Sequence, residues 1–584
     1  MVAKPISTNA KTSSSDPPVP SQEVARETAD SIVVAFILAF VFRAFVIEAF
    51  VIPTGSMAAT LYGSHGTIVC SDCGWEFAYG LTDASVRARR PDLLGSNEVA
   101  VCPNCNHHNR IVEINDDKGN AASGDRILAL KWPYDIGGTR LGPKRWDVTL
   151  FKDPSDTDLS DGVTNFIKRM VGLPGEVLEI IDGDIYTVPV DRLSNKPSLL
   201  KALDDARHAK YLRRSSSDSQ SAEARRIEAR LRSDWQNVLD ELSGEMRVCR
   251  KTPLAQDVLW TVLYDHDSRP QSLDPGQPRW AKIDPAASGW DTTGRILRFH
   301  AEDDRYDGLA LRGKKAIDRV GYNIHDRGKL CGVTDLRLRF VWTPTGGEGV
   351  LLVKLPKRER SFWAELASDG AVRLYETEGG LPSGEEPLAV EKLPPLVMDQ
   401  AVVVDFQNVD YRVSVAVDGE ELLATTPEQF SPDIAALRRL APEPDHGEIQ
   451  IFSHGLSLEL SHVVAERDVY YRSPVRGFGR PLSVLSGVTG VAWAGTGNPF
   501  LLRDGEYFML GDNSPASGDS RLWYHVGPHL VERGEGYQLG TVPADQLIGR
   551  AFFVYWPSGH RSAFIPILDR FGLIPNVGRM RWIR

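Results

Sequence analysis

The stretch FVIPTGSMAATLYG, residues 50–63, places one serine, Ser56, in a turn of small residues directly after an apolar run. Gly-Ser pairs are common in turns, so an ordinary turn at the end of a helix is the first interpretation. A serine becomes a nucleophile only when a neighbouring group accepts its proton. The rest of the chain therefore decides whether Ser56 is a turn residue or the centre of an active site.

The apolar run before this turn is long enough to cross a membrane. Residues 32–42 are all apolar, and the apolar region spans 29–52, broken after residue 42 by Arg43 and Glu48. A membrane-spanning helix needs about 20 mostly apolar residues, and a charge late in the span can reach the interface. A cleaved export signal and a buried core helix are the alternatives, although no clear small-x-small cleavage pattern follows the run. We predict a membrane anchor over residues 29–50.

The segment before the anchor and the composition of the whole chain limit what the protein can be. Residues 1–28 are rich in Ser, Pro and Thr without apolar periodicity, which predicts a disordered tail. The whole chain has 584 residues, 42% of them hydrophobic, which is enough for several packed domains. Its net charge of -11 argues against nucleic acid as a partner, because binding to phosphates requires a basic face.

Short β-like runs separated by Gly, Pro and Asp follow the anchor, as in RILALKW, WDVTLFK and EVLEIIDGDIYTV. They predict an antiparallel β domain built from residues 51–189 and 479–584. Two insertions interrupt it. Residues 64–123 hold four of the six cysteines, and a charged helical connector over residues 190–248 precedes many short strands over residues 249–478, which predict a β-sandwich. The connector's AEARRIEARLRSDW stretch is typical of a solvated helix.

A lysine inside an apolar strand is the strongest candidate for the missing base. Lys168 stands in NFIKRMVGLPGE between Ile167 and Arg169, with Phe166 and Met170 nearby. Burial disfavours the charged form of lysine, so a buried lysine can be neutral near pH 7 and accept a proton. A lysine in the middle of a strand usually points to solvent, which is the competing interpretation.

Six segments in order resemble the bacterial type I signal peptidases, a family of membrane-bound Ser/Lys endopeptidases. These are PTGSM after the span, SGDRIL, WDVTLFKDP, FIKRMVGLPGE, GDNSPASGDSR and LIGRAFFVYWP. The resemblance implies a mainly β catalytic domain after one transmembrane helix. It implies an enzyme of the bacterial cytoplasmic membrane, with its catalytic domain on the outer face. Its substrates would be exported preproteins, whose signal peptides it removes without a catalytic cofactor, and membrane lipid would surround the anchor.

The resemblance also assigns roles to individual residues. It implies that Ser56 is the nucleophile, Lys168 the general base and Arg169 a structural ion-pair residue. The Thr54 hydroxyl and the Ser56 N–H would form the oxyanion hole. The last assignments fall in the GDNSPASGDSR segment, where one serine would orient the base and a charged pair would brace the loop: Ser517, Asp519 and Arg521.

The chain departs from the family pattern at three places. Ala59 replaces the usual proline after the serine, Trp146 replaces a glycine before the WDVTLFK strand, and GDNSPAS replaces the commoner GDNRDNS. No catalytic residue type is lost, but the loop geometry is open. The alternative functions are a catalytically inactive, anchored binding protein and a self-cleaving Ser/Lys repressor, which would carry a DNA-binding unit and no anchor. A lipoprotein-processing enzyme is a third, but the usual ones have an aspartic dyad and several spans.

The four clustered cysteines form a Cys-x2-Cys pattern twice, as Cys70 with Cys73 and Cys102 with Cys105. This spacing resembles a zinc ribbon and predicts a structural zinc site, with His107 and His108 as stand-in ligands. Disulfides are the alternative, because exported cysteines are often oxidised. Cys249 and Cys331 are either buried thiols or a pair. The large insertion resembles a concanavalin/laminin-G-like sandwich, which serves as a spacer or binds a glycan or protein ligand.

Overall fold

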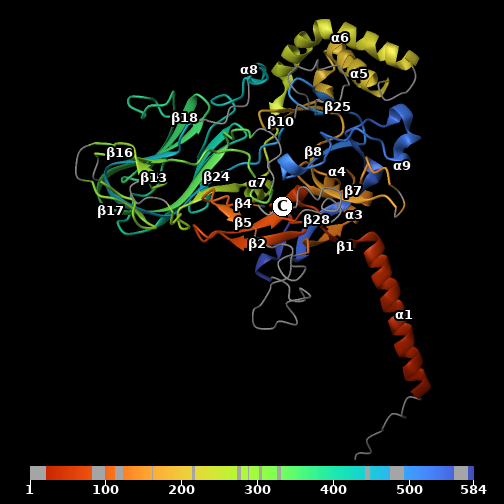
Figure 1. Cartoon of the computed structure of the whole chain (residues 1–584), viewed down its shortest axis with the longest axis horizontal. Helices are drawn as coiled ribbons and strands as arrows, with labels where there is room; N and C mark the ends of the chain where they lie inside the picture. The colour runs from red at the N-terminus through yellow and green to blue at the C-terminus, as the bar shows by residue number, and fades with distance from the viewer. Residues whose placement is uncertain are drawn as a thin grey trace, which may run out of the picture.

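The computed structural model describes residues 21–81, 99–111, 123–158, 160, 162–212, 218–272, 278–286, 289–301, 305–324, 330–440, 447–473, 492–557 and 577–584. The prediction of a mainly β protein with one apolar N-terminal helix is confirmed (Figure 1). Most of the predicted disordered tail lies outside the described residues, and residues 21–28 form the first turns of helix α1.

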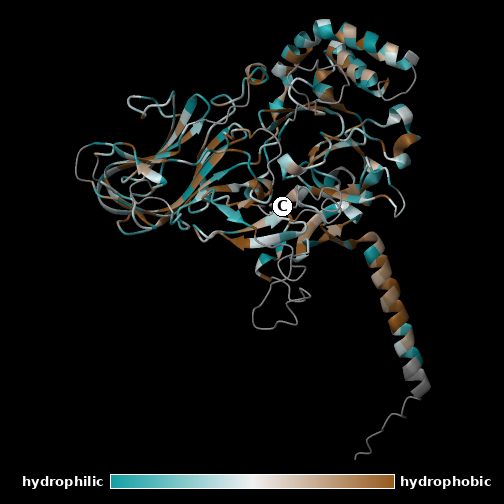
Figure 2. Cartoon of the chain, viewed as in Figure 1, coloured by the Kyte–Doolittle hydropathy of each residue, from teal (hydrophilic) through white to brown (hydrophobic). Residues whose placement is uncertain are grey.

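Helix α1, Ser21–Phe45, stands clear of the folded body (Figures 1 and 2). Its Arg26–Phe45 segment is a 20-residue candidate membrane span with mean hydropathy 1.9 and no part of it buried. At 1.5 Å per residue this segment covers about 30 Å, which matches the hydrocarbon thickness of a bilayer. The exposure excludes the core-helix alternative and fits a membrane-anchored protein.

The end of the anchor was predicted wrongly, because the helix begins at Ser21 and ends at Phe45 and not at residue 50. The next residues form strand β1, Ile47–Val51, which pairs antiparallel with β6, Arg126–Leu130. Branched residues favour the strand, and Glu48 forms an ion pair of 3.2 Å with Lys131 at the end of β6. A sheet strand therefore leads from the anchor to Ser56.

The body beside the anchor contains two antiparallel sheets. The eight-stranded sheet has the order β1-β6-β28-β7-β8-β26-β27, with β29 paired to β28, and the four-stranded sheet has the order β11-β10-β9-β25. The further strands of the first are β28 Leu547–Trp556, β7 Val148–Lys152, β8 Asn165–Gly172, β26 Glu506–Leu510, β27 Val542–Pro543 and β29 Arg581–Trp582. Those of the second are β11 Arg247–Val248, β10 Asp184–Pro189, β9 Glu176–Ile181 and β25 Phe500–Leu502.

The large insertion forms a thirteen-stranded antiparallel sheet, and its apolar core continues into residues of β9 and β10. Its two longest strands, β17 Leu336–Lys357 and β24 Gln450–Arg467, pair along most of their length. The shorter strands are β12 Thr261–Asp265, β13 Trp280–Lys282, β14 Trp290–Asp291, β15 Leu297–Phe299, β16 Asp307–Leu311, β18 Arg360–Ala367, β19 Ala371–Thr377, β20 Ala389–Lys392, β21 Val402–Val409, β22 Arg412–Val417 and β23 Glu420–Ala424. The strand-rich character predicted for this insertion is therefore present.

The helical connector packs differently from the prediction. It forms α5, Pro197–Leu212, and α6, Asp218–Glu245, which lie against each other. The solvated-helix prediction for α6 is wrong, because Trp235 and Leu242 are buried in the same core as the thirteen-stranded sheet. Apolar residues at helical spacing on one face of α6 explain this packing. The short helices are α3 Trp132–Ile136, α4 Gly138–Leu141, α7 Pro253–Leu259, α8 Ile434–Leu437 and α9 Pro528–Val531.

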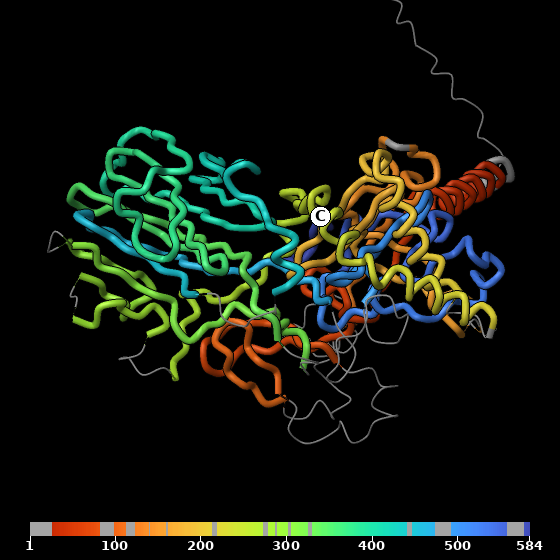
Figure 3. The backbone as a smooth tube through the Cα atoms, turned by 90° about the horizontal axis from the view of Figure 1, so that it is seen from above, coloured from red at the N-terminus to blue at the C-terminus, as the bar shows by residue number. Residues whose placement is uncertain are grey.

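The small insertion forms two hairpins that carry the cysteines. Strand β2, His65–Val69, pairs with β3, Glu76–Gly80, and β4, Val99–Val101, pairs with β5, His108–Arg110. Figure 3 shows these hairpins, in orange, between the thirteen-stranded sheet and the body that carries Ser56. We call this unit the cysteine ribbon.

A buried charge network joins the two large units. Lys251 lies between Asp410 and Asp468, with its Nζ 2.6 and 2.7 Å from their carboxylate oxygens, and all three side chains are buried. Asp184 of β10 lies close to Asp335 and Asp410, their carboxylate oxygens all within 4.8 Å. Burial and the nearby Asp335 raise the pKa of Asp184 well above its ordinary value. The insertion is thus packed firmly against the four-stranded sheet.

Candidate active site and cysteine cluster

Ser56 and Lys168 lie in direct contact, although 112 positions separate them in the sequence. Ser56 stands in a short 3-10 turn, η1, Gly55–Met57, that follows β1, and Lys168 stands in β8. The Lys168 Nζ lies 2.7 Å from the Ser56 Oγ, and the two side chains are 3% and 8% exposed. The interpretation of Ser56 as an isolated turn residue, and of Lys168 as a solvent-facing strand residue, is therefore wrong.

Burial controls the charge of Lys168. Desolvation lowers its pKa from 10.5 to about 8, while three carboxylates, led by Asp519 and Asp153, act in the opposite direction. The ammonium group also lies 5.0 Å from the centre of the Phe166 ring. When Lys168 is charged, it donates to the Ser56 hydroxyl; when it is neutral, its lone pair can accept the proton of that hydroxyl. The contact geometry thus suits both directions of proton transfer.

Arg169, next to the lysine, points into the protein and binds Asp512. Its Nε and Nη2 donate to the two carboxylate oxygens of Asp512 at 2.8 and 2.7 Å, in a bidentate pair that is almost completely buried. The hydroxyl of Thr60 donates to the same carboxylate at 2.6 Å. Because bidentate pairs fix geometry, this one ties β8 to the loop after β26 and to the chain after Ser56.

The GDNSPASGDSR segment, around residue 517, lies beside Ser56 and Lys168. Asp519 and Arg521 form a buried ion pair of 2.7 Å, and Asp519 also accepts a hydrogen bond of 3.0 Å from the Gly511 N–H. Ser517 is buried, and a Cβ added to Gly511 would lie 2.2 Å from the Ser517 Oγ and 2.5 Å from the Ser56 carbonyl oxygen. Within the described part of the chain, the Ser517 hydroxyl has no hydrogen-bond partner.

Hydrogen bonds from Asn513 hold the turn that carries Ser56 in place. The backbone N–H of Asn513 donates to the Ser56 carbonyl at 3.0 Å, and its side-chain Nδ2 donates to the Gly55 carbonyl at 2.9 Å. Thr54, at the start of η1, is extended and exposed, and its side chain makes no capping hydrogen bond to the turn. Its hydroxyl is therefore available at the surface next to Ser56.

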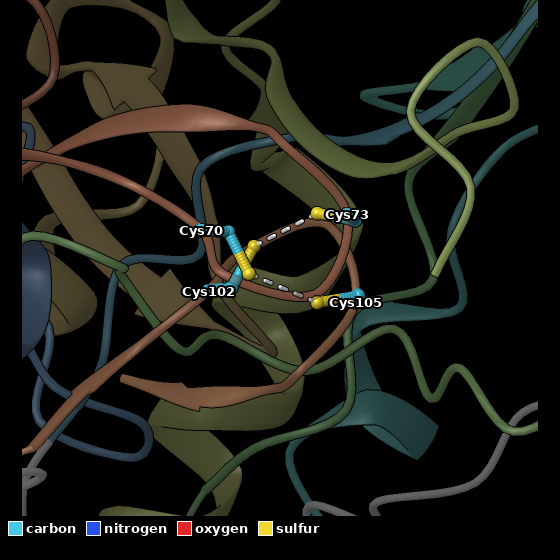
Figure 4. Close-up of side chains that lie close together, drawn as sticks. All are labelled: Cys70, Cys73, Cys102 and Cys105. Atoms are coloured by element: carbon cyan, nitrogen blue, oxygen red, sulfur yellow. Dashed lines mark hydrogen bonds between the residues drawn. The ribbon is translucent and has the colours of Figure 1, made fainter. Parts of the chain in front are cut away.

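The four cysteines of the ribbon come together as predicted (Figure 4). Cys70 Sγ lies 3.5 Å from Cys105 Sγ, and Cys73 Sγ lies 3.6 Å from Cys102 Sγ. All four are buried, and their sulfurs lie within 4.8 Å of one another. A disulfide bond is about 2.05 Å long, so these are four thiols rather than two bridges.

The surroundings of the sulfurs fit a metal. The amides of Asn104 and Asn109 donate to Cys73 Sγ and Cys70 Sγ at 3.7 and 3.6 Å, as expected for donors that stabilise thiolate ligands. Hydrogen bonds from Cys102 and Cys105 lower the pKa of Cys73, while the neighbouring thiols and burial raise the pKa values of Cys102 and Cys105. The cluster could therefore hold a structural metal with four sulfur ligands.

The remaining candidates lie apart from this cluster. The His107 side chain contacts the Ser71 hydroxyl at 3.1 Å, and neither it nor His108 belongs to the group of four sulfurs. Cys249 and Cys331 are free thiols, so the alternative of a disulfide pair is wrong.

Two segments match the signal peptidase family, peptidase S26. They are residues 107–237 and 486–556, which include Lys168 and the segment around Ser517 but not Ser56. A signal peptidase I of Pseudomonas fluorescens is 40% identical over 72 residues, which cover 12% of this chain and 23% of that protein. A signal peptidase I of Rickettsia bellii is 26% identical over 156 residues, 27% of this chain and 37% of that protein. The matches thus span less than half of either relative.

Among solved structures, the chain is similar to sugar-binding proteins at low identity. A carbohydrate-binding module, CBM66, of Bacillus subtilis has 11% identity and a TM-score of 0.22, covering 32% of this chain and 95% of that one. The carbohydrate recognition domain of Emp46p has 10% identity and a TM-score of 0.23, covering 35% and 97%. We infer no ligand from these two similarities.

Four residues around the site were not identified from the sequence. Asp512 and Asn513 stand in the quoted GDN of the last segment, which could have marked them, because a buried carboxylate and an amide beside a serine usually hold a loop. Two others, Tyr322 and Asn323, come from the large insertion and carry no local signal.

Proposed function

We propose that this protein is a membrane-anchored serine endopeptidase that removes N-terminal signal peptides from exported preproteins. The observation that carries the proposal is the 2.7 Å contact between a buried lysine amine and the Ser56 hydroxyl at the exit of an apolar helix. Partial matches to signal peptidases give independent support. The catalytically inactive alternative has less support, because the reacting groups are already in contact.

In the proposed reaction, neutral Lys168 removes the proton of the Ser56 hydroxyl while Oγ attacks the substrate carbonyl carbon. The new C–O bond produces a tetrahedral oxyanion. When the C–N bond breaks, the lysine gives its proton to the leaving amine, and an acyl-enzyme remains on Ser56. Lys168 then takes a proton from water while the water oxygen bonds to the acyl carbon. The ester bond to the Ser56 Oγ breaks, and Lys168 gives the proton to this oxygen.

The oxyanion would be bound by the Ser56 N–H and the Thr54 hydroxyl. Each preorganised donor of this kind contributes roughly 3–4 kcal/mol to transition-state stabilisation. The exposed position of Thr54 supports this role, since its side chain is not used to cap η1. Arg169, Asp519 and Arg521 would act as supports that hold β8 and the last loop in register, as their buried ion pairs indicate.

The anchor explains how a substrate would reach the site. Strand β1 leads directly from α1 to η1, so a membrane around α1 would place Ser56 close to its surface. A preprotein tethered by its own signal segment would present its cleavage site at the same depth. We propose a single-pass protein of the bacterial cytoplasmic membrane with its catalytic unit on the outer face, cutting after small residues at the first and third positions before the scissile bond.

The insertions would have separate roles in this protein. We assign the cysteine ribbon, residues 64–123, to a structural zinc site, supported by the four close sulfurs and the amide donors around them. Residues 190–248 would connect the catalytic β domain to a sandwich of the concanavalin/laminin-G type over residues 249–478. That sandwich would act as a spacer or bind a glycan or protein.

Cleavage of a radiolabelled preprotein by the detergent-purified chain tests the proposal. Wild type should cut after a small-x-small motif, and Ser56→Ala should lose this activity while keeping the wild-type unfolding temperature. Lys168→Ala should behave in the same way, and Ser64→Ala, eight residues later, serves as a control. A folded wild type that cuts nothing would favour the anchored binding protein.

A further inference from the structure

A segment of the large insertion, Asp318–Ile324, lies directly on the catalytic turn. The Tyr322 hydroxyl donates to the Ser64 carbonyl at 2.9 Å, and the Gly80 N–H donates to the Tyr322 carbonyl at 2.7 Å. The Tyr322 ring covers Gly55 so closely that an added Cβ there would lie 2.0 Å from the ring. The residue before Ser56 must therefore be glycine as long as Tyr322 is in place.

Asn323, the next residue, is connected to Ser56 through one other side chain. The amides of Asn323 and Asn513 exchange two hydrogen bonds, each of 2.8 Å. The same Asn513 holds the carbonyl groups of Gly55 and Ser56 with its Nδ2 and its backbone N–H. A reciprocal amide pair fixes which way each amide points, so Asn323 keeps the Asn513 Nδ2 directed at the turn.

The segment is itself held on both sides. Asp318 is buried and accepts a hydrogen bond of 2.9 Å from the Arg472 Nη2, and the Arg472 carbonyl accepts one of 2.7 Å from Arg521. On the other side, Lys314 donates to the Pro103 carbonyl of the cysteine ribbon at 2.8 Å. These contacts hold residues 318–324 in place next to the turn that carries Ser56.

We propose that the large insertion supplies a positioning residue to the active site, Asn323, which acts on Ser56 through Asn513. The inference rests on the proposed function of Ser56. Without Asn323, the Asn513 amide can rotate, the Gly55 carbonyl loses its donor, and Ser56 leaves its alignment with Lys168. Misplacement of a reacting group by about 1 Å can cost about 100-fold in rate.

Steady-state kinetics of the full-length protein in detergent test this inference. Asn323→Ala should lower kcat by about 10- to 100-fold while KM changes less than about twofold, because Asn323 acts on alignment and not on substrate binding. The pH at which activity falls to half should stay at its wild-type value, since Lys168 is untouched. Asn237→Ala, an exposed asparagine of α6, is the matched control and should retain wild-type kcat.

A double-mutant cycle separates positioning from general damage. Asn513→Ala should lose activity by itself, and adding Asn323→Ala should cost little more, because both act through the same contact. Should Asn323→Ala fail to fold, Asn323→Leu keeps the approximate size but loses both hydrogen bonds to Asn513, and should still lower kcat. Wild-type kcat in either folded variant, or additive losses in the cycle, would overturn the inference. Absence of cleavage by wild type would instead count against the proposed function.

Discussion

The pH dependence of cleavage gives the sharpest test of Lys168 as the base. Its pKa is about 8, so about one tenth of the lysine is neutral at pH 7 and about nine tenths at pH 9. Activity should therefore rise about tenfold per pH unit below pH 8 and level off above it. A lysine with its ordinary pKa of 10.5 would instead give a rise that continues through pH 10.

A substitution of Asp153 changes the pKa of Lys168 without touching the lysine itself. Its buried carboxylate raises the pKa of Lys168, in opposition to desolvation, and it binds the backbone and hydroxyl of Ser155 rather than the lysine. Asp153→Asn removes the negative charge and retains the shape. The pKa of Lys168 should then fall further, by up to about one pH unit for an interaction at an effective dielectric constant of about 20. The variant should be more active than wild type below pH 8 and equal to it above pH 9.

The assay is kcat/KM for a peptide with a small-x-small cleavage site, measured from pH 5.5 to 10 at constant ionic strength. Asp158→Asn is the control, because Asp158 is exposed on the same loop and is not among the main charges that shift the pKa of Lys168. If the pH at which kcat/KM reaches half its plateau is unchanged in Asp153→Asn, or higher than in wild type, Lys168 is not the titrating base. If this pH is near 10.5 in wild type, burial does not lower the pKa of the lysine.

Three further predictions concern stability, metal and the buried hydroxyl. Lys251→Met leaves two buried aspartates without their cation and should lower the free energy of unfolding by about 3–5 kcal/mol. The control Lys392→Met removes the cation of an exposed ion pair and should change this free energy by less than about 1 kcal/mol. Urea unfolding measures both changes. Metal analysis should find one zinc per chain, lost in Cys102→Ser and retained in Cys249→Ser; no zinc in wild type would contradict the assigned site. Ser517→Ala removes a buried hydroxyl that has no hydrogen-bond partner in the described residues, so the free energy of unfolding should stay the same or rise by about 1 kcal/mol. Cleavage should fall if this hydroxyl binds the lysine base during the reaction. A clear decrease in the free energy of unfolding would contradict the first expectation.

Local patterns predicted the strands around Ser56 and Lys168. Alternating and β-branched runs marked β6 to β10, whereas the apolar context of Lys168 only made it a candidate for burial, because a lysine in the middle of a strand usually points to solvent. The pairing of Ser56 with Lys168 came from the family resemblance, because no local pattern relates residues so far apart. The end of the anchor was misplaced because residues 46–52 are apolar enough for either a helix or a strand, and only pairing with β6 selects the strand.

The contacts between the insertions and the turn that carries Ser56 could not be predicted from the sequence, and the reason is physical. The ends of each insertion meet in the catalytic fold: the Asp125 N–H donates to the Tyr62 carbonyl at 2.9 Å, and the Tyr471 N–H donates to the Gly183 carbonyl at 3.1 Å. Inserted chains whose ends are already close add little closure entropy, so the β domain tolerates them whatever they contain. Their position is then set by side-chain contacts such as that of Asn323 with Asn513, which leave no periodic trace in the sequence. An insertion tolerated at the rim of the site can thus become part of it.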